Sequence, residues 1–171
     1  MKSMTVRPPD DDAFGGAEFM EAPAIEQVAE MLRERHNLPV SITFSFLWKR
    51  KGGKKGGAST RGWCVKLSGP AKYYAGKDFL VWLAADACRE ANYTPEQYVA
   101  LIYHELLFAD VSINEDTFAE TPVMRRVDFE GFLAEVRDYG AWEDGLAAFV
   151  STVEQAPLFG APDGPGMARA A

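Results

Sequence analysis

The feature that most constrains the fold is a strongly signalled helix in the middle of the chain. Thr94 and Gln97 match a capping box, in which each of the two side chains bonds to the backbone of the other residue, and Pro95 stands at the first helical position. Apolar residues then lie on several faces of the helix: Val99, Leu101, Ile102, Leu106, Leu107 and Phe108. Such a helix is buried inside a domain, so the sequence predicts a central helix over about 95–109.

Short β-rich runs that precede this helix predict the sheet that covers it. Val40–Trp48 alternates apolar and small polar residues, which is typical of a strand with one buried face. Gly62–Leu67 and Phe79–Ala84 are also short and β-rich, and apolar spacing predicts an amphipathic helix from Ala24 to about His36. These elements predict an α+β domain with a small three- or four-stranded sheet.

The chain divides into one domain and two ends. Residues 1–21 lack helical or strand periodicity and predict an irregular arm outside the core. Residues 22–155 are expected to form the single domain, and the proline- and glycine-rich composition of 156–171 predicts a flexible tail. The C-terminal part of the domain is expected to hold an irregular stretch at 110–127 and helices at 129–139 and 143–154. Two cysteines and the lack of a secretory or spanning stretch favour a cytoplasmic protein.

Charge is distributed unevenly along the chain. The net charge is -7, which excludes general attraction to phosphate as an overall property. Residues 49–77 nevertheless carry nine basic and no acidic side chains, whereas residues 78–171 carry five basic and 17 acidic ones. The sequence therefore predicts two surfaces of opposite charge.

The basic residues gather in the loop 49–61, whose four glycines and cations predict a mobile hairpin. The loop offers a nucleic-acid contact, although no aromatic residue lies within it for base stacking. It also offers a partner for the acidic half of the same chain or of a second copy. The candidate binding residues are Arg50, Lys51, Lys54, Lys55 and Arg61, the loop tyrosines Tyr73 and Tyr74, and the acidic Glu115, Asp116, Asp138, Glu143 and Asp144.

His104 and Glu105 stand in the middle of the central helix and begin a zinc-hydrolase pattern. In that pattern a second histidine follows four residues after the first, so that both imidazoles bind one metal and the glutamate activates a bound water. Here Phe108 occupies that position, and His36 is the one other histidine in the chain. A lone histidine on an apolar helix is otherwise most often a hydrogen-bonded core residue.

Several sequence stretches on both sides of the His-Glu pair follow one another in an order that a known family shares. They are Asp78–Trp82, Thr94–Gln97, Ala100–Leu106, Val127-Asp128, Phe132 and Val136–Trp142. In order and spacing, residues 24–145 resemble the metallopeptidases encoded by bacteriophages and prophages, a zincin-like family related in layout to SprT-type proteins. The resemblance implies a zincin-like fold, with the sheet packed on a former active-site helix and further helices flanking it.

Carried onto this chain, the resemblance implies that His104 is the first metal ligand and Glu105 the general base. Phe108 and Val127 stand where the second and third ligands are expected. A catalytic zinc takes about three protein ligands and a water. We therefore expect His104 and Glu105 to be vestigial, with no catalytic residue, no metal ligand and no cofactor.

These observations predict a catalytically inactive phage or mobile-element protein that binds a host or phage protein, in its sharpest form an anti-CRISPR-type inhibitor of a bacterial defence complex. One alternative is an active zinc peptidase with unusual ligands. Its donors would come from Asp110, Asp116, Asp128, Cys64 and Cys88. A second alternative is a nucleic-acid-binding module that uses the loop 49–61.

Overall fold

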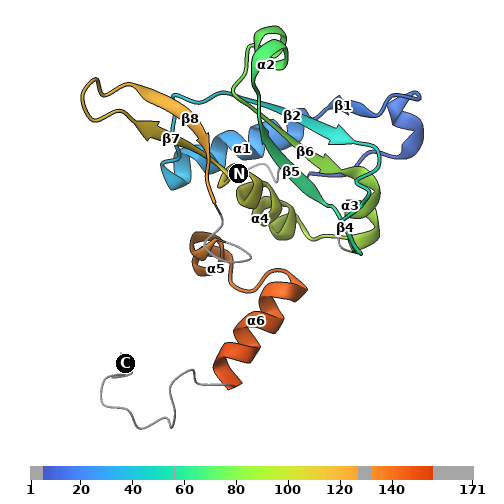
Figure 1. Cartoon of the computed structure of the whole chain (residues 1–171). Helices are drawn as coiled ribbons and strands as arrows, with labels where there is room; N and C mark the ends of the chain where they lie inside the picture. The colour runs from blue at the N-terminus through green and yellow to red at the C-terminus, as the bar shows by residue number, and fades with distance from the viewer. Residues whose placement is uncertain (1–5, 56, 127–131, 156–171) are drawn as a thin grey trace, which may run out of the picture.

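A four-stranded sheet forms the centre of the molecule in a computed structural model, which describes residues 6–55, 57–126 and 132–155 (Figure 1). The strands lie in the order β1-β2-β6-β5. The parallel pair β2 and β6 is flanked on each side by an antiparallel strand. The strands are β1 (Phe19–Glu21), β2 (Phe44–Lys49), β5 (Gly62–Lys66) and β6 (Phe79–Ala84). The prediction of an α+β domain with a small sheet is confirmed.

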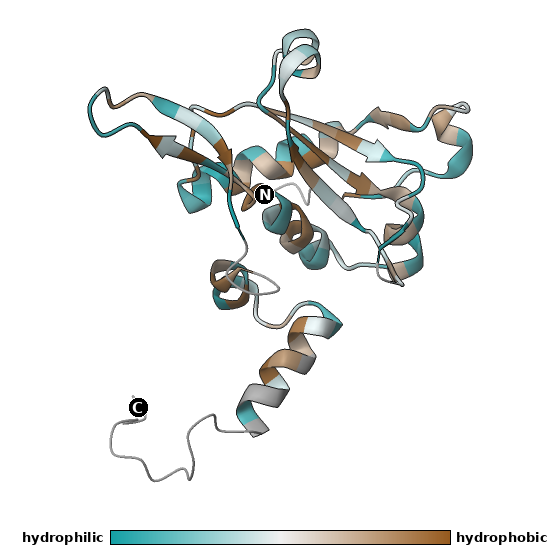
Figure 2. Ribbon diagram, in the orientation of Figure 1, coloured by the Kyte–Doolittle hydropathy of each residue, from teal (hydrophilic) through white to brown (hydrophobic). Residues whose placement is uncertain are grey.

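One face of the sheet carries the core. Phe44 and Phe46 of β2 and Phe79 and Val81 of β6 point to this face and are buried, as strand alternation requires. The helices α1 (Pro23–His36) and α4 (Pro95–Leu106) pack against it. Figure 2 shows hydrophobic stretches on the strands and on these two helices, and hydrophilic residues along the connecting turns.

The opposite face of the sheet is more accessible. Trp63 and Val65 of β5 are 41% and 36% exposed. The register places Trp63 beside Trp82 and Val65 beside Leu80, so all four side chains share this face. The sheet therefore presents an aromatic and aliphatic surface on the side opposite α1 and α4.

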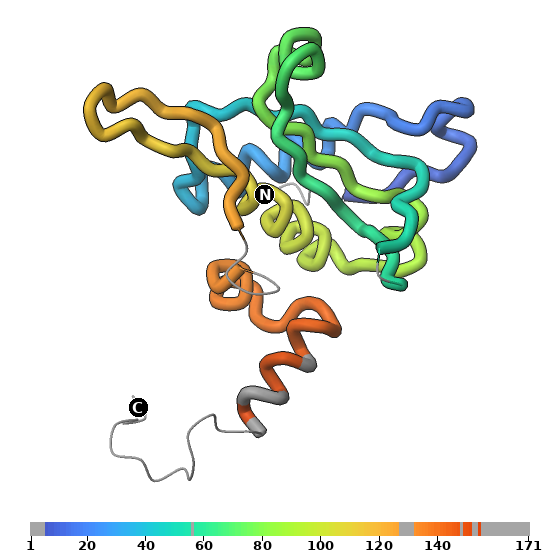
Figure 3. Tube along the Cα trace, in the orientation of Figure 1, coloured from blue at the N-terminus to red at the C-terminus, as the bar shows by residue number. Residues whose placement is uncertain are grey.

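Smaller elements surround this framework. α2 and the β7–β8 hairpin project away from the sheet in different directions (Figure 3). The elements are the 3-10 turn η1 (Asp11–Phe14), β3 (Lys54–Lys55), β4 (Ala58–Ser59), α2 (Gly69–Ala75), α3 (Ala85–Ala91), β7 (Ala109–Ile113), β8 (Glu120–Met124), α5 (Leu133–Tyr139) and α6 (Asp144–Gln155). Among the described helices, none combines the length and the apolar character needed to cross a membrane.

The start of the capped helix α4 was predicted correctly. The Thr94 side chain accepts from the Gln97 amide, and the Gln97 side chain accepts from the Thr94 amide, so the capping box is complete. The helix ends at Leu106, three residues earlier than predicted, because the Phe108 amide turns back to the Glu105 carbonyl and β7 begins at Ala109.

Two predicted irregular segments are ordered in the structure. Within 1–21, the described residues 6–21 are not an arm outside the core: β1 joins the sheet, and Val6 and Phe14 are buried. The prediction of an irregular stretch at 110–127 is likewise wrong over its described part, because β7 and β8 pair with each other there. Asn114 closes the turn between them by accepting hydrogen bonds from two backbone amides. The short helices α2 and α3 also fall where no helix was expected.

Candidate functional site

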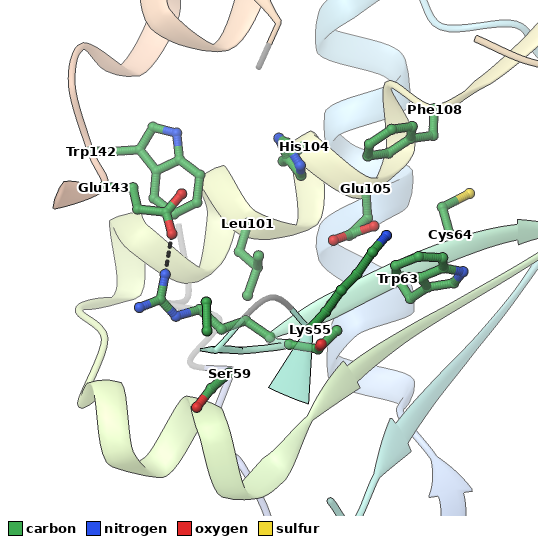
Figure 4. Close-up of a pocket in the computed structure, with 14 residues that line it drawn as sticks. Lys55, Ser59, Trp63, Cys64, Leu101, His104, Glu105, Phe108, Trp142 and Glu143 are labelled. Carbon is green, nitrogen blue, oxygen red and sulfur yellow. Dashed lines mark hydrogen bonds and ion pairs between the residues drawn. The ribbon is translucent and has the colours of Figure 1, made fainter. Parts of the chain in front are cut away.

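A pocket of about 340 Å³ lies between the edge strand β5 and the helix α4 (Figure 4). Helix α4 contributes Leu101, His104 and Glu105 to its wall, and Phe108 follows directly after the helix. The other lining residues are Lys55, Ala58, Ser59, Thr60, Arg61, Gly62, Trp63, Cys64, Trp142 and Glu143. The structure thus places the predicted His-Glu pair in a pocket rather than in the packed core.

Glu135 of α5 holds the imidazole of His104. Its Oε2 lies 2.7 Å from His104 Nδ1, and its Oε1 accepts from the Trp142 indole at 3.3 Å. The Glu135 side chain is 1% exposed, whereas that of His104 is 22% exposed. The contact therefore fixes the orientation of the imidazole at the pocket wall.

The electrostatics of His104 follow from these neighbours. Burial lowers its pKa, but the hydrogen bond that the imidazole donates to Glu135 and the charges of Glu105, Glu135 and Glu143 outweigh burial, so the pKa of His104 is raised above its usual value of 6.5. The carboxylates around the imidazole thus favour its protonated form more than burial opposes it.

Glu105 lies deeper and is 4% exposed. Burial raises the pKa of its carboxyl to about 7, with the charge of His104 acting against this shift and that of Glu135 adding to it. A side chain at Gly62 would meet this carboxyl, because a Cβ atom there would lie 2.5 Å from Glu105 Oε1. The glycine in β5 therefore makes room for the buried acid.

Phe108 packs where the zinc pattern has its second imidazole. Its ring lies edge to face against His104 with the centroids 5.3 Å apart, and against Phe132 at 5.1 Å. The His104 and Phe132 rings are also in contact, at 5.5 Å. The three rings form a cluster at this end of the pocket, and a phenyl ring offers no lone pair to a metal.

The donor set of the described residues does not fit a catalytic zinc. Over 6–55, 57–126 and 132–155, no three His, Cys, Asp or Glu side chains come together at metal-binding geometry. Cys64 lines the pocket as a buried thiol whose pKa is raised by burial and by the charge of Glu105. Asp110 and Asp116 belong to the β7–β8 hairpin, Cys88 is buried in α3, and Val127 and Asp128 lie outside the described residues.

The family model described as putative phage metallopeptidase matches residues 17–153. The chain belongs to this family. No curated protein and no solved structure matches the chain. This match confirms the prediction of a phage metallopeptidase relative. It spans every strand of the sheet that adjoins the pocket.

In this phage metallopeptidase family member, the predicted basic residues fall into two groups. Arg61 forms an ion pair with Glu143 at the pocket, and Arg50 lies 3.8 Å from Asp11. Lys51, Lys54 and Lys55 are exposed and form no ion pair within the described part of the chain. The expected pairing of the basic segment with the acidic half of the same chain is therefore found at Arg61.

The predicted acidic residues do not form one face. Glu115 and Asp116 lie in the turn between β7 and β8, whereas Glu143 and Asp144 lie at the start of α6 (Figure 1). Asp138 is on α5, where its carboxylate pairs with Arg137 and, at 3.2 Å, with His36. His36 also stacks on Tyr103 at 4.3 Å, so it links α1 to α4 and α5 and takes no part in the pocket.

The tyrosine pair behaves as expected, although its local structure differs. Tyr73 and Tyr74 are 83% and 86% exposed, but they lie on the short helix α2 rather than in a loop. Their rings meet edge to face at 5.3 Å.

Sequence reasoning missed Glu135 as the partner of His104. A signal was present, because Phe132, Glu135, Val136 and Tyr139 recur at helical spacing and place the glutamate on the apolar side of α5. A carboxylate on a buried helix face requires a partner. Gly62 was also missed, since its role depends on the distance between β5 and α4.

Proposed function

We propose that this chain is a non-catalytic member of the phage metallopeptidase family that binds a polypeptide at the pocket between β5 and α4. The observation that carries the proposal is the packing of Phe108 against His104 and Phe132. This ring takes the place of a metal-binding imidazole, and Glu135 binds the remaining histidine. A hydrophobic cluster thus stands where the zinc chemistry of the family would need a second imidazole.

The polypeptide is expected to add to β5. This strand is at the edge of the sheet and pairs on one side with β6, while its other edge pairs with no strand among the described residues. An extended peptide binds such an edge through main-chain hydrogen bonds, and pockets beside the edge select its side chains. The apolar groups Trp63, Leu101 and Trp142 line the adjoining pocket and favour an apolar or aromatic side chain there.

The family supports a proposal for the setting of the partner. We propose that this chain has exchanged catalysis for binding and acts on a protein complex of the host or of the phage, and the sharpest form of the proposal is inhibition of a CRISPR effector. The supporting observations are the family and the separation of basic and acidic segments along the chain. Interference assays with and without the protein test this form directly.

The absence of catalysis is tested on the purified chain and on Glu105→Gln. By plasma mass spectrometry, we expect the purified chain to contain substoichiometric zinc. We also expect the wild type and Glu105→Gln to show the same background level of denatured-casein hydrolysis. About one equivalent of zinc, together with proteolysis abolished in Glu105→Gln, would overturn the proposal and establish a working peptidase.

The binding site is tested by photo-crosslinking. A photoreactive residue replaces Ser59, at the pocket, and the control replaces Thr117, in the turn of the β7–β8 hairpin. We expect one protein of a bacterial lysate to crosslink at position 59 and not at 117, and Trp63→Ala to reduce the yield. Equal crosslinking at both positions, or none at 59, contradicts polypeptide binding at this pocket.

A further inference from the structure

A second surface of the molecule, separate from the floor of the pocket, combines indole rings and cations. Trp63 and Trp82 are register partners on the open face of the sheet. Lys55 Nζ lies 4.7 Å from the centroid of the Trp63 ring, and Lys49 Nζ lies 4.8 Å from that of the Trp82 ring. We call Lys49, Lys51, Lys54, Lys55, Trp63 and Trp82 the basic aromatic surface.

The cations of this surface have few counter-charges. Residues 49–77 contain nine basic and no acidic side chains. Lys51, Lys54 and Lys55 form no ion pair with the described residues, and Lys49 pairs only at 3.4 Å with a Glu18 side chain that is 65% exposed. An exposed pair of this kind is worth little and is easily exchanged for another anion.

Exposed rings also follow β5 along the chain. The strand leads into α2 (Figure 3), which carries the exposed Tyr73 and Tyr74. Lys66 closes β5 and is exposed, but strand alternation places it on the face of Gly62 and Cys64, opposite Trp63 and Trp82. The basic aromatic surface is therefore limited to the part of the sheet beside the β3–β4 hairpin.

We propose that the basic aromatic surface binds single-stranded nucleic acid. Indole faces stack on unpaired bases, and the lysine that lies over each ring moves its ammonium group to the adjoining phosphate when a base takes its place. An acidic peptide would use the lysines but would leave the two indoles without a matching flat partner, and a duplex keeps its bases stacked away from the rings. The loop 49–61 lacks aromatic residues of its own, and the fold supplies them from β5 and β6.

This proposal does not depend on the proposed function of the pocket. Lys51, Lys54 and Trp82 do not line the pocket, so variants at these positions test the surface and leave the pocket lining intact. Lys55 and Trp63 belong to both sites and are left unchanged.

The test is fluorescence anisotropy of labelled dT15 and rU15 with the full chain at several salt concentrations. We expect affinity for at least one of the oligonucleotides that falls as salt rises, and the two probes separate DNA from RNA as the source. Lys51→Glu/Lys54→Glu is expected to weaken binding and to reduce the slope of log K against log salt by up to about 1.4, since each phosphate contact on a single strand contributes about 0.7. Arg7→Glu/Arg35→Glu, which makes the same change in net charge at exposed positions elsewhere, is the matched control.

Stacking is tested by Trp82→Leu, with Trp82→Phe as the variant that keeps a ring. Trp82→Leu is expected to weaken binding by a factor of about 5 to 150 at an unchanged salt slope, which corresponds to about 1–3 kcal/mol per stacked base. Circular dichroism confirms that each variant is folded. Failure of both oligonucleotides to bind, equal loss in both charge variants, or tighter binding of poly-glutamate than of dT15 and rU15 overturns the proposal.

Discussion

The buried carboxyl of Glu105 makes the stability of the folded chain depend on pH, and Glu105→Gln should remove that dependence. The carboxyl is 4% exposed, and its pKa in the folded chain is about 7, against a usual value of 4.5. The folded state therefore holds a proton that the unfolded state releases between these two values. Wild-type stability should fall as pH rises from about 4.5 to about 7 and then level off.

The size of the effect follows from the same two pKa values. At about 1.4 kcal/mol per pH unit, the interval between 4.5 and about 7 corresponds to roughly 3 kcal/mol of lost stability at pH 8. At pH 5 the loss is below about 1 kcal/mol, because unfolded chains are then only partly ionised. Glutamine has nearly the same shape as the protonated acid and carries no charge at either pH, so it avoids this cost.

The assay is urea denaturation of the wild type and Glu105→Gln at pH 5 and pH 8. The variant should gain about 2 kcal/mol relative to the wild type between the two conditions, or about 4–8 °C in Tm for a chain of this length. Glu96→Gln, at an exposed carboxylate on the same helix, is the matched control for the loss of a charge from α4. A difference between wild type and Glu105→Gln that is the same at both pH values would refute the reasoning.

Three further substitutions test the surroundings of the pocket. Gly62→Ala should destabilise the chain by about 1–3 kcal/mol in urea denaturation, because the new Cβ presses on Glu105 and Leu83; Gly145→Ala, where the space is open, should not. Glu135→Gln should lower the pKa of His104 in an NMR titration of its imidazole, and an unchanged pKa would remove Glu135 as the cause of the raised value. Thr94→Ala should cost about 1 kcal/mol of unfolding free energy through loss of the capping box, whereas Thr94→Ser should retain most of it, and equal losses would contradict the cap.

Elements with local signals could be predicted from the sequence. The capping box at Thr94 and Gln97 involves residues three apart, so the start of α4 was evident without any tertiary information. The strand β6 is a continuous apolar run and was predicted with its observed bounds, Phe79–Ala84. Both elements are determined by neighbours in the sequence.

Elements that depend on distant pairing could not be predicted in the same way. β1 is three residues long and gains its hydrogen bonds from β2, about thirty residues later in the sequence. β8 contains Pro122 and is exposed over much of its length, so it lacks the period-two pattern of a half-buried strand. Its pairing with β7 forms through a turn whose closing residue, Asn114, carries no strand signal of its own.

The same distinction holds for the site. His104, Glu105 and Phe108 are close in sequence, and their spacing alone predicted a disrupted zinc pattern. Glu135 contacts His104 from a position 31 residues later in the sequence. Gly62 approaches Glu105 from the edge strand of the sheet. The indole rings beside the basic loop were missed for the same reason, because β5 and β6 supply them.

The titration of Glu105 also reports whether the pocket carries a metal, because a divalent cation beside a buried carboxyl stabilises its ionised form. Without such a charge, burial outweighs the attraction of His104 and the pKa stays near 7. A zinc ion at His104 would hold the carboxylate ionised and would remove the fall in stability between pH 4.5 and 7. On the proposed loss of the metal site, we expect zinc to have no effect on stability. At pH 5 the urea denaturation profile should be the same with added zinc as with a chelator, and the same should hold at pH 8. Stabilisation by zinc that is larger at pH 8 than at pH 5, with a smaller difference between the two pH values in Glu105→Gln, would show that the pocket still binds the ion.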